Sequence, residues 1–186
     1  SSIEALLGLM FFAILTGLLY GRFSRPNPII IYSNNALISP YLDINGLMLR
    51  LSNERNNQII NVSATMVLSR NELVDGQIKR KYYPLDLERD TVKYLAMSWT
   101  LVHPITENSV LYNETLESLH ESDTEILVTI EGIDETLSDP IHSRKSYLYP
   151  QIVIGAGFLP IMHEENDYYV LDLKKINAFE PRILNA

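Results

Sequence analysis

Hydrophobic positions along the chain follow two patterns, one before Arg22 and one after Pro26. Between Ala5 and Tyr20 there is no charged residue, and apolar side chains leave no polar face for a helix. After Pro26, short apolar segments alternate with turn residues to the end of the chain. This order predicts one membrane-crossing helix followed by a domain of β-strands.

The apolar run from Ile3 to Tyr20 is long enough to cross a membrane. As a helix it spans about 27 Å, and a bilayer core is about 30 Å thick. A signal peptide carries positive charge before its apolar core, whereas here Glu4 precedes the run and Arg22 and Arg25 follow it. A buried core helix rarely lacks a polar face over several turns. A transmembrane helix is therefore favoured, with its C-terminal end in the cytoplasm.

Small residues recur every four positions in this helix, at Ala13, Gly17 and Gly21. Such a row allows a second helix to approach closely. It is also compatible with plain packing that involves no hinge. Since a lone helix facing only lipid has no need of this row, the pattern predicts additional helices or an oligomer.

The rest of the chain predicts a β-sandwich. Apolar and mostly polar residues alternate from Ile60 to Ser69, which indicates a strand with one buried face. Asn45-Gly46 and Asp75-Gly76 predict hairpin turns. Further strands are predicted at 29–32, 47–51, 94–102, 126–130, 152–154 and 168–173, and one short helix at 114–120. The fold class is all-β, immunoglobulin-like, with a transmembrane helix at 1–22, a tether at 23–30 and the β domain at 31–186.

Composition restricts the function further. The chain has no cysteine, so disulfides and Cys-based metal sites are excluded. Its net charge of −8 argues against a nucleic-acid partner. No Lys or Arg occurs between Lys93 and Arg144, a span rich in Asp and Glu. This span is either a solvated acidic surface or a surface that concentrates cations.

Catalytic motifs are absent from the sequence. The four histidines lack ligand spacing, and no HExxH, nucleophile elbow, P-loop or Rossmann glycine pattern occurs. We therefore predict no enzyme, no catalytic residue, no cofactor and no metal site. Two functions remain compatible with these observations. One is a membrane-anchored β-sandwich that acts as a binding or adhesion module, and the other is an enzyme with an unrecognised site.

Four segments of the chain resemble segments of a known protein family and occur in the same order. They are Thr16 to Pro26, Trp99 to Tyr112, Glu125 to Gly132 and Ser143 to Tyr147. The first resembles the end of an inner pore helix, the second a central strand and its following loop, and the last two the segments that flank a constriction loop. Together the sequence resembles the inward-rectifier potassium channel family, closest to its prokaryotic branch.

The resemblance implies roles for helix residues. Gly17 matches the hinge glycine, and Tyr20 matches the bulky residue at the helix crossing, where four copies close the pore. Phe12 stands where strongly rectifying members carry an acidic residue. With Thr16 and Tyr20, it is expected to face the pore. Basic residues that contact phosphoinositide or other anionic lipid headgroups in the family are matched by Arg22 and Arg25.

The resemblance also implies roles in the β domain. Asn61 takes the place of an acidic position in the cytoplasmic pore, and Glu135 keeps another, so Glu135 is the expected site of block by Mg²⁺ or polyamines. The segment from Glu135 to His142 is the expected constriction loop, and its central residues are Thr136, Leu137, Ser138 and Asp139.

For the whole protein, the resemblance implies a homotetramer in the cell (inner) membrane, with the β domain in the cytoplasm and K⁺ as the permeant ion. The family's TVGYG-like selectivity filter does not occur in the printed sequence. We therefore expect the chain to be a fragment of a longer pore-forming subunit.

Overall fold

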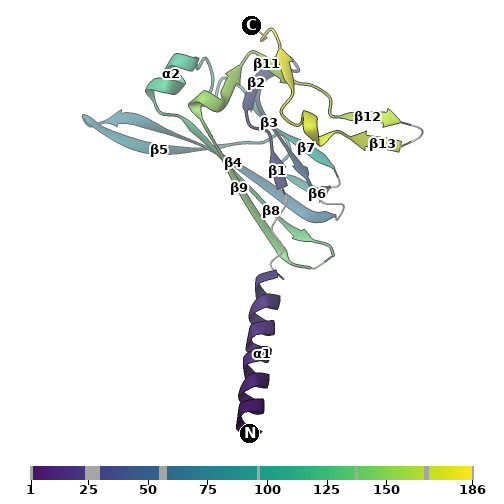
Figure 1. Cartoon of the computed structure of the whole chain (residues 1–186). Helices are drawn as coiled ribbons and strands as arrows, with labels where there is room; N and C mark the ends of the chain where they lie inside the picture. Colours follow the sequence, from purple (N-terminus) through teal and green to yellow (C-terminus); the bar gives the residue numbers. More distant parts are fainter. Residues whose placement is uncertain are drawn as a thin grey trace.

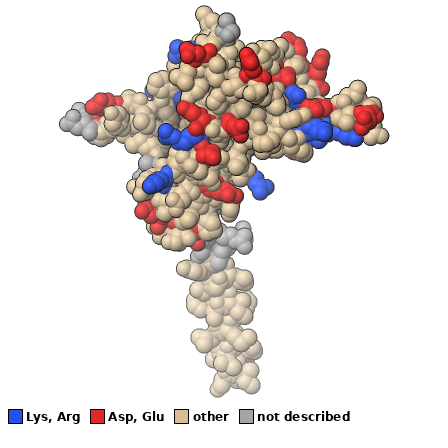
Figure 2. All heavy atoms as spheres, turned by 180° about the vertical axis from the view of Figure 1, so that it is seen from behind, with Lys and Arg blue, Asp and Glu red and all other residues tan. Residues whose placement is uncertain are grey.

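The computed structural model describes residues 2–23, 30–54, 58–95, 97–136, 138–165 and 168–185, with the side chains of residues 21–23 left aside. One long helix, α1 (Ser2–Phe23), projects from a domain built mainly of strands (Figure 1). Charged side chains gather on that domain, whereas the surface of α1 is almost entirely uncharged (Figure 2). The predicted tether lies mostly outside the described residues.

Two five-stranded sheets form the body of the domain. The first contains β1 (Ile30–Tyr32), β2 (Ala36–Tyr41), β3 (Ile44–Asn53), β7 (Ser98–Ile105) and β10 (Ile152–Ile154). The second contains β4 (Ile59–Val74), β5 (Gln77–Leu85), β6 (Thr91–Leu95), β8 (Glu125–Asp134) and β9 (Pro140–Leu148).

Smaller elements complete the domain. Two two-stranded ribbons pair β11 (Ala156–Phe158) with β14 (Phe179–Pro181) and β12 (Met162–Glu165) with β13 (Tyr168–Leu171). The short helices are α2 (Leu116–Glu121), η1 (Tyr149–Gln151) and η2 (Leu173–Lys175). Within the described residues, β10 and β2 form the only parallel strand pair.

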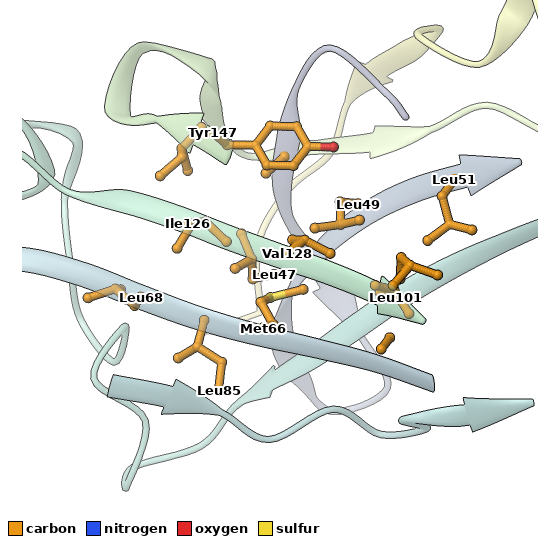
Figure 3. Close-up of a cluster of buried hydrophobic side chains, with 14 of the residues drawn as sticks. Leu47, Leu49, Leu51, Met66, Leu68, Leu85, Leu101, Ile126, Val128 and Tyr147 are labelled. Carbon is orange, nitrogen blue, oxygen red and sulfur yellow. The ribbon is translucent and has the colours of Figure 1, made fainter. Parts of the chain in front are cut away.

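The hydrophobic core lies between the two sheets (Figure 3). Alternate residues of β3 point inward, and Leu47, Leu49 and Leu51 are completely buried. The second sheet meets them with buried residues of β4 and β8, among them Met66 and Val128. The predicted sandwich is thereby confirmed, and so is the buried face of the predicted strand from Val62 to Leu68.

The outer face of β3 is covered as well. The Arg50 guanidinium lies 4.5 Å from the centre of the Phe158 ring and donates a 2.9 Å hydrogen bond to the Leu159 carbonyl. Burial lowers the pKa of Arg50 below its ordinary value. Since the segment after β11 shields this side, β3 is buried on both faces.

One predicted turn is wrong. Asn45 and Gly46 lie inside β3, and the chain reverses at Leu42 and Asp43, where Leu42 has a φ of 51°. Gly46 serves close packing instead, because an added Cβ would lie 3.2 Å from Val102 Cγ1. By contrast, the predicted turn at residues 75 and 76 joins β4 to β5, with positive φ at both positions.

The strand predicted over residues 94–102 is two strands. β6 pairs with β4 in the second sheet, whereas β7 pairs with β3 in the first. The chain therefore crosses between the sheets within this apolar segment. The short predicted helix is present as α2, and Thr115 caps it by accepting a hydrogen bond from the Ser118 amide.

Two tyrosines connect the chain around β1 to β9. The Tyr32 hydroxyl donates a 2.9 Å hydrogen bond to Ser143 Oγ, and the Tyr147 hydroxyl donates a 3.0 Å bond to the Ser33 carbonyl. Burial raises the pKa of Tyr147 to about 12. Its phenol is therefore a neutral hydrogen-bond donor at physiological pH.

The core predicts a large difference between two identical truncations. Leu49→Ala removes a completely buried side chain and is expected to lower the free energy of unfolding by about 2–5 kcal/mol. Leu42→Ala, at a residue 82% exposed, is expected to change it by less than about 0.5 kcal/mol. Urea unfolding of the chain in detergent, followed by Trp99 fluorescence, measures both. Equal losses would show that the sheet contact is not the stabilising core.

Candidate functional site

Helix α1 forms the first part of the candidate site. Its 22 residues span about 33 Å, enough to cross a bilayer core. Residues Ser2–Tyr20 are apolar enough for a membrane span, and none of this segment is buried against the rest of the chain. Phe12 and Tyr20 are 67% and 76% exposed. The helix thus offers its whole apolar surface to lipid or to other chains.

Phe12, Thr16 and Tyr20 follow one stripe of α1 at four-residue spacing. The Thr16 hydroxyl donates a 2.8 Å hydrogen bond to the Phe12 carbonyl, so this polar group is satisfied within the helix. Around Gly17 an added Cβ would meet nothing within 4 Å. No contact of the described chain therefore requires glycine there, and its hinge role stays a prediction. The Arg22 side chain and all of Arg25 lie outside the described residues.

A β-bulge in β4 places Asn61. The register between β4 and β8 shifts between Ile60 and Ser63, and Asn61 has a φ of 50°, a left-handed conformation that asparagine tolerates. Opposite the bulge, a Cβ on Gly132 would lie 2.9 Å from Ile59 Cγ2. The bulge leaves Asn61 exposed and buries Ile59 in place of Ile60, a shift that the predicted alternation missed.

The connection between β8 and β9 forms the second part of the site. Asp134 is buried and organises it: its Oδ1 accepts a 2.8 Å hydrogen bond from the Thr136 amide. Its backbone carbonyl accepts from the Ser138 amide at 2.8 Å, and its amide donates to the Asp139 carbonyl at 2.9 Å. Ser138 has a φ of 56°. These bonds define a tight turn that holds Glu135 exposed.

The predicted constriction loop, residues 135–142, includes the start of β9. Residues 140–142 belong to β9 and pair with residues 131–133 of β8, because the antiparallel ladder continues to Pro140. The connecting segment is therefore residues 135–139, of which Leu137 lies outside the described residues. Near the end of the ladder, His142 Nδ1 and Glu131 Oε1 lie 3.5 Å apart on the exposed face. No site role was predicted for Glu131 or Asp134, although an Asp at the start of a turn is a recognisable signal.

Asn61 and Glu135 belong to the same end of the second sheet. The Glu135 amide donates a 3.1 Å hydrogen bond to the Gln58 carbonyl just before β4, and Ile59 pairs with Asp134. Figure 1 places the β8–β9 hairpin at the end of the domain nearest α1. The structure thus brings the two predicted polar positions to one region, facing the side from which the helix emerges.

The histidines are not gathered into a ligand set. His103 is buried, with Nδ1 2.6 Å from the Asp86 carbonyl and Nε2 2.7 Å from Ser109 Oγ, and burial lowers its pKa. His120 packs on the Tyr149 ring with the ring centres 4.6 Å apart. Across the part of the chain that the structure describes, no group of three or more His, Cys, Asp or Glu side chains is placed to hold a metal ion.

A membrane helix followed by a β-sandwich defines a membrane protein with a β domain outside the bilayer. The family profile described as "Inward rectifier potassium channel C-terminal domain" matches residues 30–182, nearly the whole β domain. The chain therefore belongs to the inward rectifier potassium channel family.

Curated relatives agree with this assignment. The chain is 35% identical over 161 residues to inward rectifier potassium channel Kirbac3.1 of Paramagnetospirillum magnetotacticum, covering 86% of this chain and 55% of that protein. It is 27% identical over 186 residues to inward rectifier potassium channel 4 of Homo sapiens, covering 94% and 41%. The chain thus spans about half the length of these relatives.

A likeness in fold was also found to the sporulation control protein Spo0M of Bacillus subtilis. The identity is 11% and the TM-score 0.33, with 67% of this chain and 47% of that chain covered. A similarity this low supports no conclusion about fold or function.

The turn after β8 predicts a graded response at residue 134. Asp134→Ala removes the acceptor of the Thr136 amide and is expected to lower the free energy of unfolding by about 1–2 kcal/mol. Asp134→Asn keeps an oxygen acceptor and is expected to lower this free energy by less. Hydrogen exchange at the Thr136 amide, combined with urea unfolding, measures both effects. Equal protection of this amide in the Ala variant and the unmodified chain would contradict the role of Asp134.

Proposed function

We propose that this chain is the pore-lining helix and cytoplasmic domain of a pore-forming subunit of an inward-rectifier potassium channel. The observation that carries the proposal is the order of its parts: an apolar helix of membrane length at residues 2–20 directly precedes the family's C-terminal domain at residues 30–182. The names of the relatives, which are potassium channels, support the permeant ion.

Association of several copies follows from the surface of α1. The helix is uncovered within its own chain and carries a row of small residues, at Ala13 and Gly17, that lets neighbouring helices approach. We infer a homotetramer in the cell membrane. In it, the Phe12, Thr16 and Tyr20 stripe faces the central pore, and a ring of Tyr20 side chains closes the pore by excluding water.

The β domain extends this pore into the cytoplasm. The polar face of the second sheet carries exposed Asn61 and Thr65 and ends at the exposed carboxylate of Glu135. Four copies around one axis multiply this negative field and raise the local concentration of K⁺. The same carboxylates attract Mg²⁺ and polyamines. Arg22 and Arg25 follow the apolar run in the sequence, and we propose that they bind anionic lipid headgroups.

Flux measurements on the full-length subunit test the proposal. Reconstituted in liposomes, it is expected to pass K⁺ in preference to Na⁺ and to cross-link as a tetramer. A stable monomer without K⁺ flux would reject the channel and favour a membrane-anchored binding module.

Truncation of the proposed gate is expected to increase the leak. Tyr20→Ala removes a bulky, 76% exposed aromatic ring from the pore stripe, so open probability should rise severalfold. Phe11→Ala is the matched control, because Phe11 lies on the opposite face of α1 from Tyr20. Single-channel recording of the full-length variants measures both. An unchanged open probability in Tyr20→Ala would show that Tyr20 is not the gate.

Neutralisation of the proposed blocking site is expected to weaken block. Glu135→Gln removes one carboxylate per subunit, four per channel, so the concentration of Mg²⁺ or spermine for half block should rise about tenfold, equivalent to about 1.4 kcal/mol. Glu121→Gln is the control, because Glu121 is an exposed carboxylate on α2, at the end of the domain far from α1 (Figure 1). Equal block of both variants and the unmodified channel would show that Glu135 is an ordinary surface residue.

A further inference from the structure

A cavity of about 490 Å³ lies at the end of the domain far from α1 (Figure 1). Three segments supply most of its walls: the turn into β3 at residues 43–45, the loop that follows β7 at residues 105–107 and 111–114, and residues 184 and 185. Pockets that bind small molecules in proteins have volumes of this size. The pore proposed above does not involve this cavity.

Aliphatic side chains form the inner wall of the cavity. Ile38, Ile105 and Leu111 are buried in the domain and turn part of their surface toward the cavity. Three half-buried residues complete this wall: Ile44, Ile154 and Leu184. A ligand with an apolar body would cover this surface and leave water, and both changes favour binding.

The outer wall of the cavity carries negative charge and an aromatic ring. Asp43 and Glu107 are exposed, and neither forms an ion pair with a residue that the structure describes. A third carboxylate, that of Glu114, is compensated by Arg70 at 2.7 Å. Tyr112 lines the same cavity and is 45% exposed. Carboxylates and the face of an aromatic ring both attract organic cations, so this wall favours a positively charged ligand.

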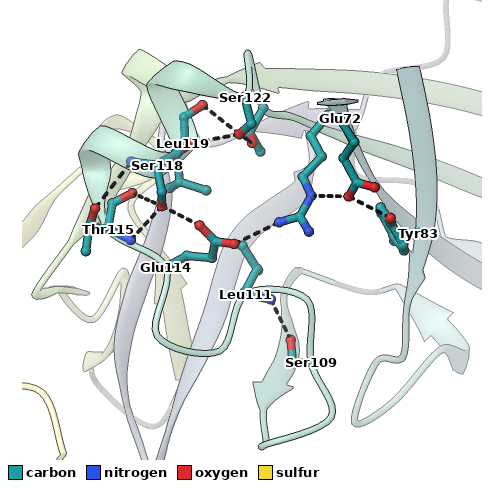
Figure 4. A network of polar contacts seen from close by, with 11 residues as sticks. Glu72, Tyr83, Ser109, Leu111, Glu114, Thr115, Ser118, Leu119 and Ser122 are labelled. Carbon is teal, nitrogen blue, oxygen red and sulfur yellow. Dashed lines mark hydrogen bonds and ion pairs between the residues drawn. The ribbon is translucent and has the colours of Figure 1, made fainter. Parts of the chain in front are cut away.

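Polar contacts fix the loop that follows β7 (Figure 4). Ser109 Oγ accepts a 3.2 Å hydrogen bond from the Leu111 amide. The Glu114 carboxylate accepts hydrogen bonds from Arg70 in β4 and from the Ser118 hydroxyl in α2. The loop is therefore held between a strand and a helix before any ligand binds, which reduces the entropy lost on binding.

Two asparagines fix another wall of the cavity. The Asn185 amide donates a 2.9 Å hydrogen bond to Asn45 Oδ1, and Asn45 Nδ2 donates a 3.0 Å bond to the Asn185 carbonyl. Asn185 Nδ2 also donates to the Ile44 carbonyl at 2.6 Å. These bonds join residues 184 and 185 to the start of β3, so the cavity is preformed on this side as well.

We propose that this cavity binds a small organic cation, an ammonium group attached to an apolar body about as large as one aromatic ring. The apolar body lies against the aliphatic wall, and the ammonium group lies near the carboxylates of Asp43 and Glu107 and the ring of Tyr112. Like charge excludes anions of the same size. The inference goes beyond the channel function proposed above and does not depend on it.

Three probe molecules separate the two parts of this recognition. Phenethylammonium has the charge and the ring, ethylammonium has the charge alone, and phenylacetate has the ring with the opposite charge. Each is titrated into the chain in detergent, and methyl NMR signals of Ile44 and Ile154 report binding, with exposed Ile78 as the control signal outside the cavity. Phenethylammonium is expected to bind with a Kd below about 1 mM, and the other two at least about tenfold more weakly. Absence of a saturable shift with phenethylammonium, or equal binding of all three probes, would overturn the proposal.

Two variants test the assigned walls with the same titration. Asp43→Asn with Glu107→Gln removes the uncompensated carboxylates and is expected to raise the Kd of phenethylammonium about tenfold. Thr106→Trp, at an exposed residue of the wall, is expected to fill the cavity and abolish binding. Glu117→Gln with Glu121→Gln is the matched control, because it removes the same charge from exposed positions on α2 outside the cavity. An unchanged Kd in both test variants would overturn the site, whereas K⁺ flux tests the channel proposal separately.

Discussion

The contact between the two sheets is the interaction on which the rest of the domain depends. The chain has no disulfide, so burial of the β3 leucines against β4 and β8 stabilises the sandwich. The same strands carry the candidate site at their ends. β4 leaves the core through the bulge at Asn61, and β8 leaves it through the turn at Asp134. Packing at the centre therefore fixes where the polar groups lie at the edge.

The helix and the domain satisfy opposite requirements. α1 is apolar on every side and is not covered by the described part of its own chain, so its surface suits lipid. The domain buries its apolar surface internally and exposes a polar sheet face. The β4–β5 and β12–β13 hairpins are exceptions, because they expose tyrosines and aliphatic side chains to water. Both parts of the chain thus leave apolar surface that the described residues do not cover.

The sequence predicted the parts of the fold with strong periodicity. The apolar helix, the alternating strand after Ile59 and the Asp75-Gly76 turn each follow from a local pattern. Other features depend on distant contacts. Gly46 resembles a turn residue, but its lack of a side chain serves packing against Val102. The crossing from β6 to β7 leaves no local signal, because residues 94–102 form one nearly continuous apolar segment.

The candidate site was predictable to a similar extent. Asn61 and Glu135 came from a family resemblance, and the structure brings them to the same end of one sheet. The bulge that turns Asn61 outward requires Gly132 on another strand, about seventy residues away in the sequence. The role of Asp134 depends on hydrogen bonds within the turn between β8 and β9. No pattern along one strand encodes either arrangement.

The tyrosine hydrogen bonds around β1 have a mechanical consequence. β1 is the first described strand after α1, and Tyr32 and the Ser33 carbonyl bind β9 directly. β9 begins at the turn that holds Glu135. A force applied along the helix axis therefore loads β9 through two side-chain bonds as well as through the backbone. Because burial raises the pKa of Tyr147 to about 12, its hydrogen bond to the Ser33 carbonyl keeps its donor across the pH range of a living cell.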